Sequence, residues 1–585
     1  MQTLKNYTPW LAVLAFCYAL SASADERAFA EQLRERIEAV AVDMPLIVDH
    51  RPVYAQQALI QHYTAHLFKP VWSKNGRLSP QALQLIEALS HAESQGLDAD
   101  NYHTATVARH LQTLQGSLDS NERIKILVDM DLLLSDAFLT YSTHMLQGRV
   151  NPETLTSKWE IPRQTFNILC SLDDAVSKDC IDEALDNLTP KHQGYRLLLK
   201  ALADYRQIKA QGGWGRIASG PKLALGNVGT RVVQLRKRLA ATSDLEPEPD
   251  ADVDSTLFDA PLKEAVKLFQ QRHGLADDGV VGAQTLAALD VSIEARIEQL
   301  LVNLERWRWL PSDLGGRYIL VNIAGFELYF VEDNKVVLKM PVVVGKTYRK
   351  TPVFSGKMTY VVINPSWHVP TSIAVKDKLP VLRKNPDYLQ QHNMKLYRGW
   401  GANAEEIDPL SVDWRKLNEH HFPYHIVQQP GPDNALGKIK FMFPNKYNVY
   451  LHDTSEPWLF KKTERSFSSG CIRVGKPFVL ADYVLENNTR LKKTAIPDLF
   501  KQSEKKTLSL KHAIPVHVLY WTAWVDDSGK LNFRKDIYGR DRELAKALQS
   551  LPGEISSRIQ PGLVKAQSAP SYTALDDTIE NKLNR

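Results

Sequence analysis

The stretch YNVYLHDTSEPWLFKKTERSFSSGCIRV, residues 447–474, is the most informative part of this sequence about structure and chemistry. Its first six residues alternate bulky and polar side chains as a β-strand does, and they end at His452. Small residues precede Cys471, so no bulky neighbour hinders approach to the sulfur. A strand-borne imidazole and a turn-borne thiol are the two parts of a cysteine nucleophile, because the imidazole can accept the thiol proton. We therefore predict a catalytic pair, and the plainer alternative is an inert buried cysteine beside a packed histidine.

The residue before the cysteine supports the catalytic interpretation. Gly470 has no Cβ, so its backbone amide and that of Cys471 could both face a substrate carbonyl. Two such amides would form an oxyanion hole for the tetrahedral intermediate of acyl transfer.

The segment resembles the signature of the YkuD-type L,D-transpeptidases. That signature is a histidine, a spacer, and then Ser/Thr-His-Gly-Cys followed by an apolar residue and Arg or Asn. His452 matches the catalytic histidine, Cys471 the nucleophile and Gly470 the oxyanion glycine. Ser468 falls on the family's Ser/Thr, and Arg473 on the trailing basic residue. With its flanks, the resemblance covers residues 303–541.

One position departs from the common pattern. Ser469 stands where most members carry a second histidine. The YcbB-like branch of the family tolerates serine there, so the resemblance points to that branch and weakens any role for a second imidazole.

The resemblance implies a peptidoglycan L,D-transpeptidase. Such an enzyme transfers an acyl group from a tetrapeptide stem to the side-chain amine of diaminopimelate on a second stem, and it needs no cofactor. The product is a direct diaminopimelate–diaminopimelate cross-link in the cell wall. The residues assigned in this way are Cys471 (nucleophile), His452 (general acid/base) and Gly470 (oxyanion amide), with Tyr450, Ser468, Ser469, Arg473 and Trp367 at the substrate.

Two roles stay open in the sequence. Arg473 could form a structural ion pair or grip a substrate carboxylate, and the resemblance favours the substrate. The imidazole of His452 needs an orienting acceptor, for which the candidates are Asp453, a backbone carbonyl near Tyr450, or Ser468.

Two other functions use the same features. A cysteine L,D-carboxypeptidase or peptidase would cut the same stems with water as the acceptor. A non-catalytic protein would only bind peptidoglycan. We predict no metal site, because no Cys/His cluster with ligand spacing stands out.

Composition and the N-terminus indicate where the protein works. The chain has 585 residues and a net charge of only +5, which gives no reason to expect nucleic acid as a partner. Residues 1–24 combine a lysine, an apolar run and a small-residue cleavage site, which is typical of a secretory signal peptide. The apolar run is shorter than the about 20 residues that span a bilayer, so an uncleaved anchor is the weaker alternative. We expect a soluble periplasmic protein that meets peptidoglycan stems and glycan, with other wall-synthesis enzymes as possible partners.

Cysteine usage fits export. In an oxidising compartment Cys170 and Cys180, in a polar segment that we expect to be a loop, would pair as a disulfide. Cys471 is then the unpaired cysteine, which in a secreted protein favours a reactive thiol.

The pattern along the chain predicts a multidomain α+β protein. Residues 25–220 have helical spacing of apolar residues, and within them residues 68–103 resemble the scaffold region of YcbB-like transpeptidases, so we predict a helical scaffold domain over residues 25–220. Residues 221–292 resemble a three-helix peptidoglycan-binding domain, with its FQ, GL, DG and G-x-x-T elements. The alternative there is a helical spacer without affinity for glycan.

The second half of the chain changes period. Residues 303–541 include strands of period two and predict a mostly-β YkuD catalytic domain. A helical capping insertion at about residues 366–435 interrupts them, and its place before the catalytic segment suggests a lid. Aromatic residues such as Trp367 and Trp400 could cover a peptide there or simply pack. The polar tail, residues 561–585, is predicted to be disordered.

Overall fold

The structure, a computed structural model, describes most of the chain. The described residues are 24–40, 44–155, 159–161, 167–246, 255–489, 496–500, 502, 504–553 and 555. The predicted signal peptide, apart from its last residue, and the predicted disordered tail lie outside them. No helix within these ranges combines the length and the apolar character needed to cross a membrane.

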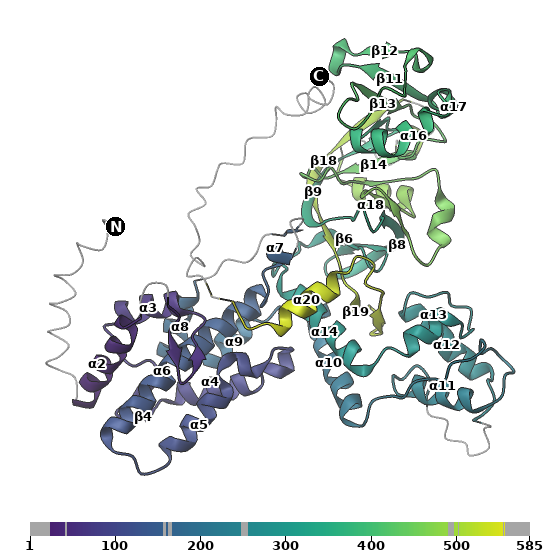
Figure 1. Cartoon of the computed structure of the whole chain (residues 1–585). Coiled ribbons are helices and arrows are strands. Elements are labelled where there is room, and N and C mark those ends of the chain that lie inside the picture. The colour runs from purple at the N-terminus through teal and green to yellow at the C-terminus, as the bar shows by residue number, and fades with distance from the viewer. Residues whose placement is uncertain are drawn as a thin grey trace.

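The N-terminal region is helical, as predicted, and is built around one long helix. Helix α6 (Ser120–Gln147) begins at a capping box in which Asp119 and Glu122 each bond the other's backbone amide. Every residue from 127 to 146 is buried, because helices cover α6 on several sides (Figure 1). The surrounding helices are α2 (Ala24–Glu38), α3 (Gln56–Ala65), α4 (Pro80–Ser90), α5 (Thr104–Leu114), α8 (Ile168–Ser177) and α9 (Ile181–Leu188).

The segment that carries the predicted disulfide is not a loop. It forms α8 and the start of α9, because Ile168, Leu172 and Ala175 recur at helical spacing and are buried. Cys180 lies at the N-terminal end of α9 and forms no disulfide with any residue whose side chain the structure describes. The side chain of Cys170 lies outside what the structure describes, so the pairing stays a prediction.

A buried histidine on α6 makes this region sensitive to acid. His144 is 3% exposed and its Nδ1 lies 3.0 Å from the Tyr102 hydroxyl. Burial, followed by Arg149 and Arg308, lowers its pKa to about 3. The unfolded chain protonates this histidine below pH about 6.5 while the folded chain does not, so stability falls as pH drops from about 6.5 towards 3. The slope from this one group approaches about 1.4 kcal/mol per pH unit.

We therefore expect amides of α6 to exchange faster at pH 5 than at pH 7 after correction for intrinsic exchange. His144→Gln should make this dependence shallower, whereas His91→Gln, which changes an exposed histidine of the same region, should leave it intact. Equal slopes in the wild type and His144→Gln would contradict the assignment.

The second region consists of three helices, as predicted. They are α11 (Thr230–Ala240), α12 (Ala260–Arg272) and α13 (Ala283–Leu289). The motif residues hold one another: the Gln270 side-chain amide donates to Asp278 Oδ1 and to the Val280 carbonyl, both at 2.9 Å, and its oxygen accepts from the Gly279 amide. The motif therefore maintains the fold of this region.

The region predicted to be catalytic is a ten-stranded sheet. Its order is β14-β15-β17-β8-β7-β6-β18-β9-β5, with β16 beside β8. Because β9 pairs with both β18 and β14, the sheet closes on itself. The strands are β5 (Trp159–Glu160), β6 (Arg317–Asn322), β7 (Glu327–Glu332), β8 (Lys335–Gly345), β9 (Val353–Ile363), β14 (Ile439–Met442), β15 (Leu451–His452), β16 (Ser466–Ser468), β17 (Ile472–Val474) and β18 (Lys506–Leu519).

Helices α10 (Gln193–Ala210) and α14 (Ile293–Arg308) share a core with this sheet. Tyr195 of α10 and Trp307 of α14 are buried in it. Beyond the sheet, β19 (Ala523–Val525) and β20 (Leu531–Phe533) form a hairpin, and α20 (Arg540–Gln549) packs beside α14.

The insertion, called the cap from here on (residues 366–435), contains helices as predicted, but it also contains strands that were not predicted from the sequence. It contains a four-stranded sheet of order β10-β13-β11-β12. Its strands, of three to five residues, are too short to give a clear alternation. The cap has its own buried core and lies at the end of the main sheet away from α10 (Figure 1). Its elements are β10 (Trp367–Val369), α15 (Thr371–Ile373), η3 (Ala374–Lys378), α16 (Leu379–Leu382), α17 (Tyr388–Gln391), β11 (Met394–Arg398), β12 (Glu405–Ile407) and β13 (Tyr424–Gln428).

Candidate active site

Two adjacent parallel strands position the predicted catalytic residues, His452 within β15 and Cys471 directly before β17. Strand β15 pairs with β17 so that Leu451 lies beside Ile472 and His452 beside Arg473. Leu451 and Ile472 are fully buried and point into the core. Because side chains alternate along a strand, His452 and Cys471 share the opposite face. They are diagonal neighbours across this pair of strands, a separation that side chains can bridge.

The imidazole of His452 is held in one tautomer. Its Nδ1 lies 2.6 Å from the backbone carbonyl of Asp453, which can only accept, so Nδ1 carries the proton and Nε2 is left as a base. Burial lowers the pKa of His452 to about 3, and the positive charges of Arg473 and Lys440 act in the same direction. The ring is therefore neutral at neutral pH. The orienting group is Asp453, but through its main chain: the Asp453 carboxylate accepts from the amides of Lys438 and Thr454 instead.

The thiol of Cys471 is also neutral at rest. Burial raises its pKa, while hydrogen bonds from Tyr450 and the charge of Lys440 oppose that rise. Its Sγ donates towards the Asn448 carbonyl at 3.6 Å. The side chains of Trp367 and Cys471 both influence the Tyr450 hydroxyl, whose pKa burial raises well above its usual value, so Tyr450 lies between the cap and the nucleophile.

The turn before Cys471 is fixed by hydrogen bonds. Ser468 Oγ donates to the Cys471 carbonyl at 2.5 Å and accepts from the Gly470 amide at 3.1 Å. Thr351 Oγ1 donates to the Gly470 carbonyl at 2.9 Å. Gly470 has φ +122°, a conformation that favours glycine.

These bonds correct two expectations. The Gly470 amide donates to Ser468, so in this conformation it is not directed at a substrate oxyanion. Ser468, 5% exposed, shapes the turn from within and does not line an open surface. Of the two predicted oxyanion donors, the Cys471 amide remains.

An arginine that no sequence motif singles out joins the turn to the cap. Arg349 donates to Ser469 Oγ at 2.9 Å, and both of its terminal nitrogens contact the Asp377 carboxylate in η3, Nη2 at 2.8 Å. Ser469, expected at the substrate, is therefore bonded to the arginine. The distances in sequence, from 349 to 377 and 469, explain why no spacing pattern revealed this contact.

Comparison with known proteins identifies the region that contains this pair. Residues 316–496, which include His452 and Cys471, match the family model of the L,D-transpeptidase catalytic domain. This chain contains an L,D-transpeptidase catalytic domain. Residues 57–202 match a scaffold domain, and residues 228–289 match the "Putative peptidoglycan binding domain".

Relatives of the transpeptidase domain are partial matches. A "Putative L,D-transpeptidase" from Haemophilus influenzae is 35% identical over 281 residues, which are 46% of this chain and 55% of that protein. The chain thus spans about half the length of this curated relative. Two L,D-transpeptidase structures also match. The one from Xylanimonas cellulosilytica has 16% identity and a TM-score of 0.16, and the match covers 52% of this chain and 99% of that one. The one from Stackebrandtia nassauensis has 15% identity and a TM-score of 0.20, and the match covers 52% of this chain and 96% of that one. TM-scores this low carry no argument, and membership of the YcbB-like branch stays a prediction.

Arg473 was expected to form either a structural ion pair or a contact with a substrate carboxylate, and in the structure it forms an ion pair. Its guanidinium pairs with the Glu456 carboxylate and is largely buried. Beside His452 in the strand pairing, Arg473 also helps to keep the imidazole unprotonated.

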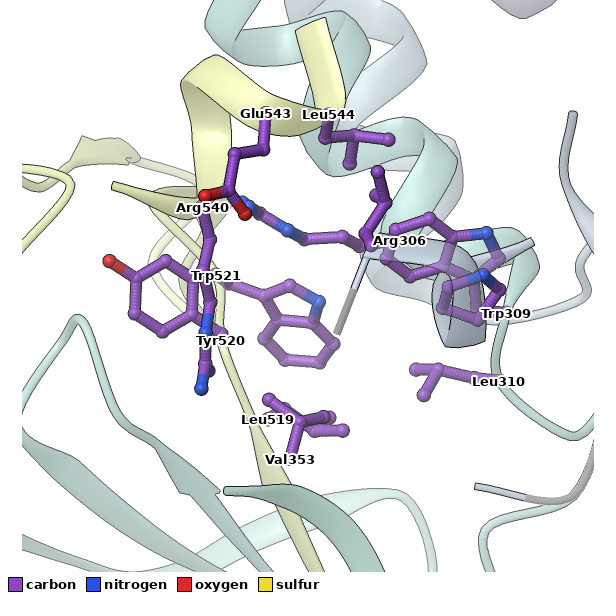
Figure 2. A pocket seen from close by; sticks show the side chains of 12 residues that line it. Arg306, Trp309, Leu310, Val353, Leu519, Tyr520, Trp521, Arg540, Glu543 and Leu544 are labelled. Carbon is purple, nitrogen blue, oxygen red and sulfur yellow. The ribbon is translucent and has the colours of Figure 1, made fainter. Parts of the chain in front are cut away.

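A hydrophobic pocket lies apart from the site. Figure 2 shows it between α14, α20 and the end of β18, with Trp309 and Trp521 among its walls. It contains none of the predicted catalytic residues.

Within the described residues there is one group of possible metal ligands, which consists of His62, His66 and Asp173 of the scaffold. The prediction that the chain has no such cluster was wrong, because it overlooked the four-residue spacing of the two histidines.

Breaking the arginine link should weaken catalysis by the transpeptidase domain moderately. Arg349→Gln removes a charge-assisted pair that is partly open to solvent, which is worth about 1 kcal/mol. We expect about a fivefold lower kcat/KM and faster hydrogen exchange in η3. Lys395→Gln removes the ion pair to Glu406 within the cap and is the matched control, for which neither quantity should change. An unchanged Arg349→Gln enzyme would show that the link has no functional role.

Proposed function

We propose that this protein is a peptidoglycan L,D-transpeptidase in which Cys471 is the nucleophile and His452 the general acid and base. The observation that carries the proposal is the parallel pairing of β15 and β17, which sets both side chains on one face of the L,D-transpeptidase catalytic domain. The neutral Nε2 of His452 supports it as the base, since a protonated ring could not accept the thiol proton.

The first half of the reaction forms a thioester. The thiol turns from the Asn448 carbonyl towards His452, and Nε2 takes its proton. The sulfur attacks the carbonyl carbon of the donor stem at the bond between an L-centre and a D-amino acid, so that a C–S bond forms. When the tetrahedral intermediate collapses, the C–N bond breaks and His452 returns the proton to the leaving D-amino acid.

The second half regenerates the enzyme. The side-chain amine of diaminopimelate on a second stem attacks the thioester and gives up a proton to His452. The new C–N bond joins two diaminopimelate residues, and the C–S bond breaks to restore the thiol with that proton.

Charge that develops during both halves needs hydrogen-bond donors. The Tyr450 hydroxyl contacts the sulfur and is suited to stabilise the thiolate. The Cys471 amide is the backbone donor for the oxyanion. The Gly470 amide could join only if the substrate displaces its bond to Ser468.

The rest of the chain suits a substrate of the cell wall. The match of residues 228–289 to a peptidoglycan-binding domain supports glycan as a second ligand. With the predicted signal peptide, it supports a periplasmic location. No step of the mechanism calls for a metal or another cofactor.

The test separates transfer from hydrolysis. Purified protein is incubated with disaccharide-tetrapeptide stems, and the products are read by mass spectrometry. A dimer that has lost one terminal D-alanine supports transpeptidation. A trimmed tripeptide monomer alone would make the protein an L,D-carboxypeptidase, and no turnover with intact glycan binding would leave only a binding role.

A further inference from the structure

Three side chains that could bind a metal meet in the scaffold, far from the candidate active site. His62 lies in the last turn of α3, His66 follows directly after the helix, and Asp173 lies on α8. His62 Nδ1 is 3.4 Å from Asp173 Oδ1, and His66 Nε2 is 3.5 Å from the same oxygen. All three ligand atoms lie within 4.8 Å of one another. None of these residues takes part in the proposed transfer reaction.

His62 is buried without a hydrogen-bond partner. It is 4% exposed, and neither of its ring nitrogens forms a hydrogen bond with any described residue. Buried polar atoms are nearly always paired, so an exception requires an explanation. His62 Nδ1 and His66 Nε2 both lie within 3.5 Å of the same Asp173 oxygen, and an ion bound by these atoms would give the buried His62 nitrogen a partner.

The separations suit a small ion. Tetrahedral Zn²⁺ with bonds of about 2.0–2.1 Å holds neighbouring ligand atoms about 3.3–3.4 Å apart. The two nitrogen–oxygen separations are close to this value, whereas a direct hydrogen bond would be shorter.

The imidazole of His66 has a free lone pair. Its Nδ1 lies 2.9 Å from the His62 carbonyl, so Nδ1 carries the proton and leaves Nε2 free for a metal. Ligation requires such an unprotonated nitrogen.

We propose that His62, His66 and Asp173 bind one divalent transition-metal ion of the Zn²⁺ class, which joins α3 to α8. Two imidazoles and one carboxylate suit this class, while Mg²⁺ and Ca²⁺ prefer oxygen ligands alone. Since His66 is exposed, the fourth coordination position faces solvent. The ion would hold α8 against the helices around α6.

The test is metal binding by the full chain. Protein carrying Cys471→Ser, which removes the reactive thiol as a competing ligand, is freed of metal with a chelator and titrated with ZnCl₂ by calorimetry. We expect one equivalent of tight binding, weakened at least about tenfold by His66→Gln and by Asp173→Asn. Asp174→Asn and His91→Gln change exposed residues of the same region and should bind as the parent does.

The absorption spectrum of bound Co²⁺ is a second measurement, which does not depend on the heat of binding. Co²⁺ should give the visible absorption of a tetrahedral N/O site in the parent and in the two controls, and not in His66→Gln or Asp173→Asn. Zn²⁺ should also slow hydrogen exchange in α8. The proposal is overturned if no stoichiometric Zn²⁺ binds, if Mg²⁺ binds equally well, or if ligand and control variants behave alike.

Discussion

Cys471→Ser is expected to lower the rate of cross-link formation by about 10⁴-fold or more, the scale seen when a covalent nucleophile is removed. Serine keeps the size and the hydrogen-bonding capacity of the side chain. It cannot form the thiolate that a neutral His452 can generate from cysteine, because a hydroxyl is far less acidic than a thiol. The measurement is the initial rate of dimer formation from purified stems.

Two controls isolate the nucleophile from general effects. Cys180→Ser changes a cysteine of the scaffold, outside the candidate active site, and should retain the parent rate. Unchanged thermal unfolding of Cys471→Ser would show that the fold is intact. A serine variant that still forms dimers at a similar rate would rule out the thioester route.

His452→Gln should reduce kcat/KM by about 10²–10⁴-fold, the usual contribution of a general base. The pH profile of kcat/KM distinguishes the loss of a general base from a structural effect of the substitution. In the parent, His452 stays unprotonated down to about pH 3 to 4, so its protonation should cause no loss between pH 5 and 7. In the variant only spontaneous thiolate reacts, and burial raises the pKa of Cys471, so residual activity should rise steadily above pH 8.

Alkylation of Cys471 gives the same information without substrate. The reaction of the thiol with iodoacetamide should be slower in His452→Gln at pH 7 and approach the parent rate at high pH. His420→Gln changes an exposed histidine of the cap and should follow the parent curve. Identical curves for the parent and His452→Gln would mean that the imidazole does not activate the thiol.

The sequence predicted the parts of the site that depend on local chemistry. Alternation over residues 447–452 predicted a strand, but only Leu451–His452 forms one, because the chain turns at residues 446–447 and Asn448 has φ +52°. The small residues before Cys471 do form a turn, and the pairing of β15 with β17 sets His452 and Cys471 on one face. The helical scaffold and the three-helix region followed in the same way from apolar periodicity.

What the sequence could not give depends on contacts between distant segments or on main-chain atoms. The orienting group of His452 is a carbonyl, which any residue carries. The Gly470 amide is occupied by a hydroxyl whose rotation no motif specifies. Arg349 reaches Ser469 only after the sheet and the cap have folded. In the cap, strands of three to five residues left no period to detect.

The central claim is a covalent bond between the donor stem and the sulfur of Cys471. Intact-protein mass spectrometry, after rapid acid quenching of a mixture of the full chain with a tetrapeptide stem and no acceptor, tests it most directly. The account predicts an added mass equal to the stem minus its terminal D-alanine, mapped to Cys471 by peptide analysis and absent from Cys471→Ser. A protein that releases D-alanine while its own mass never changes, in either form, would contradict it.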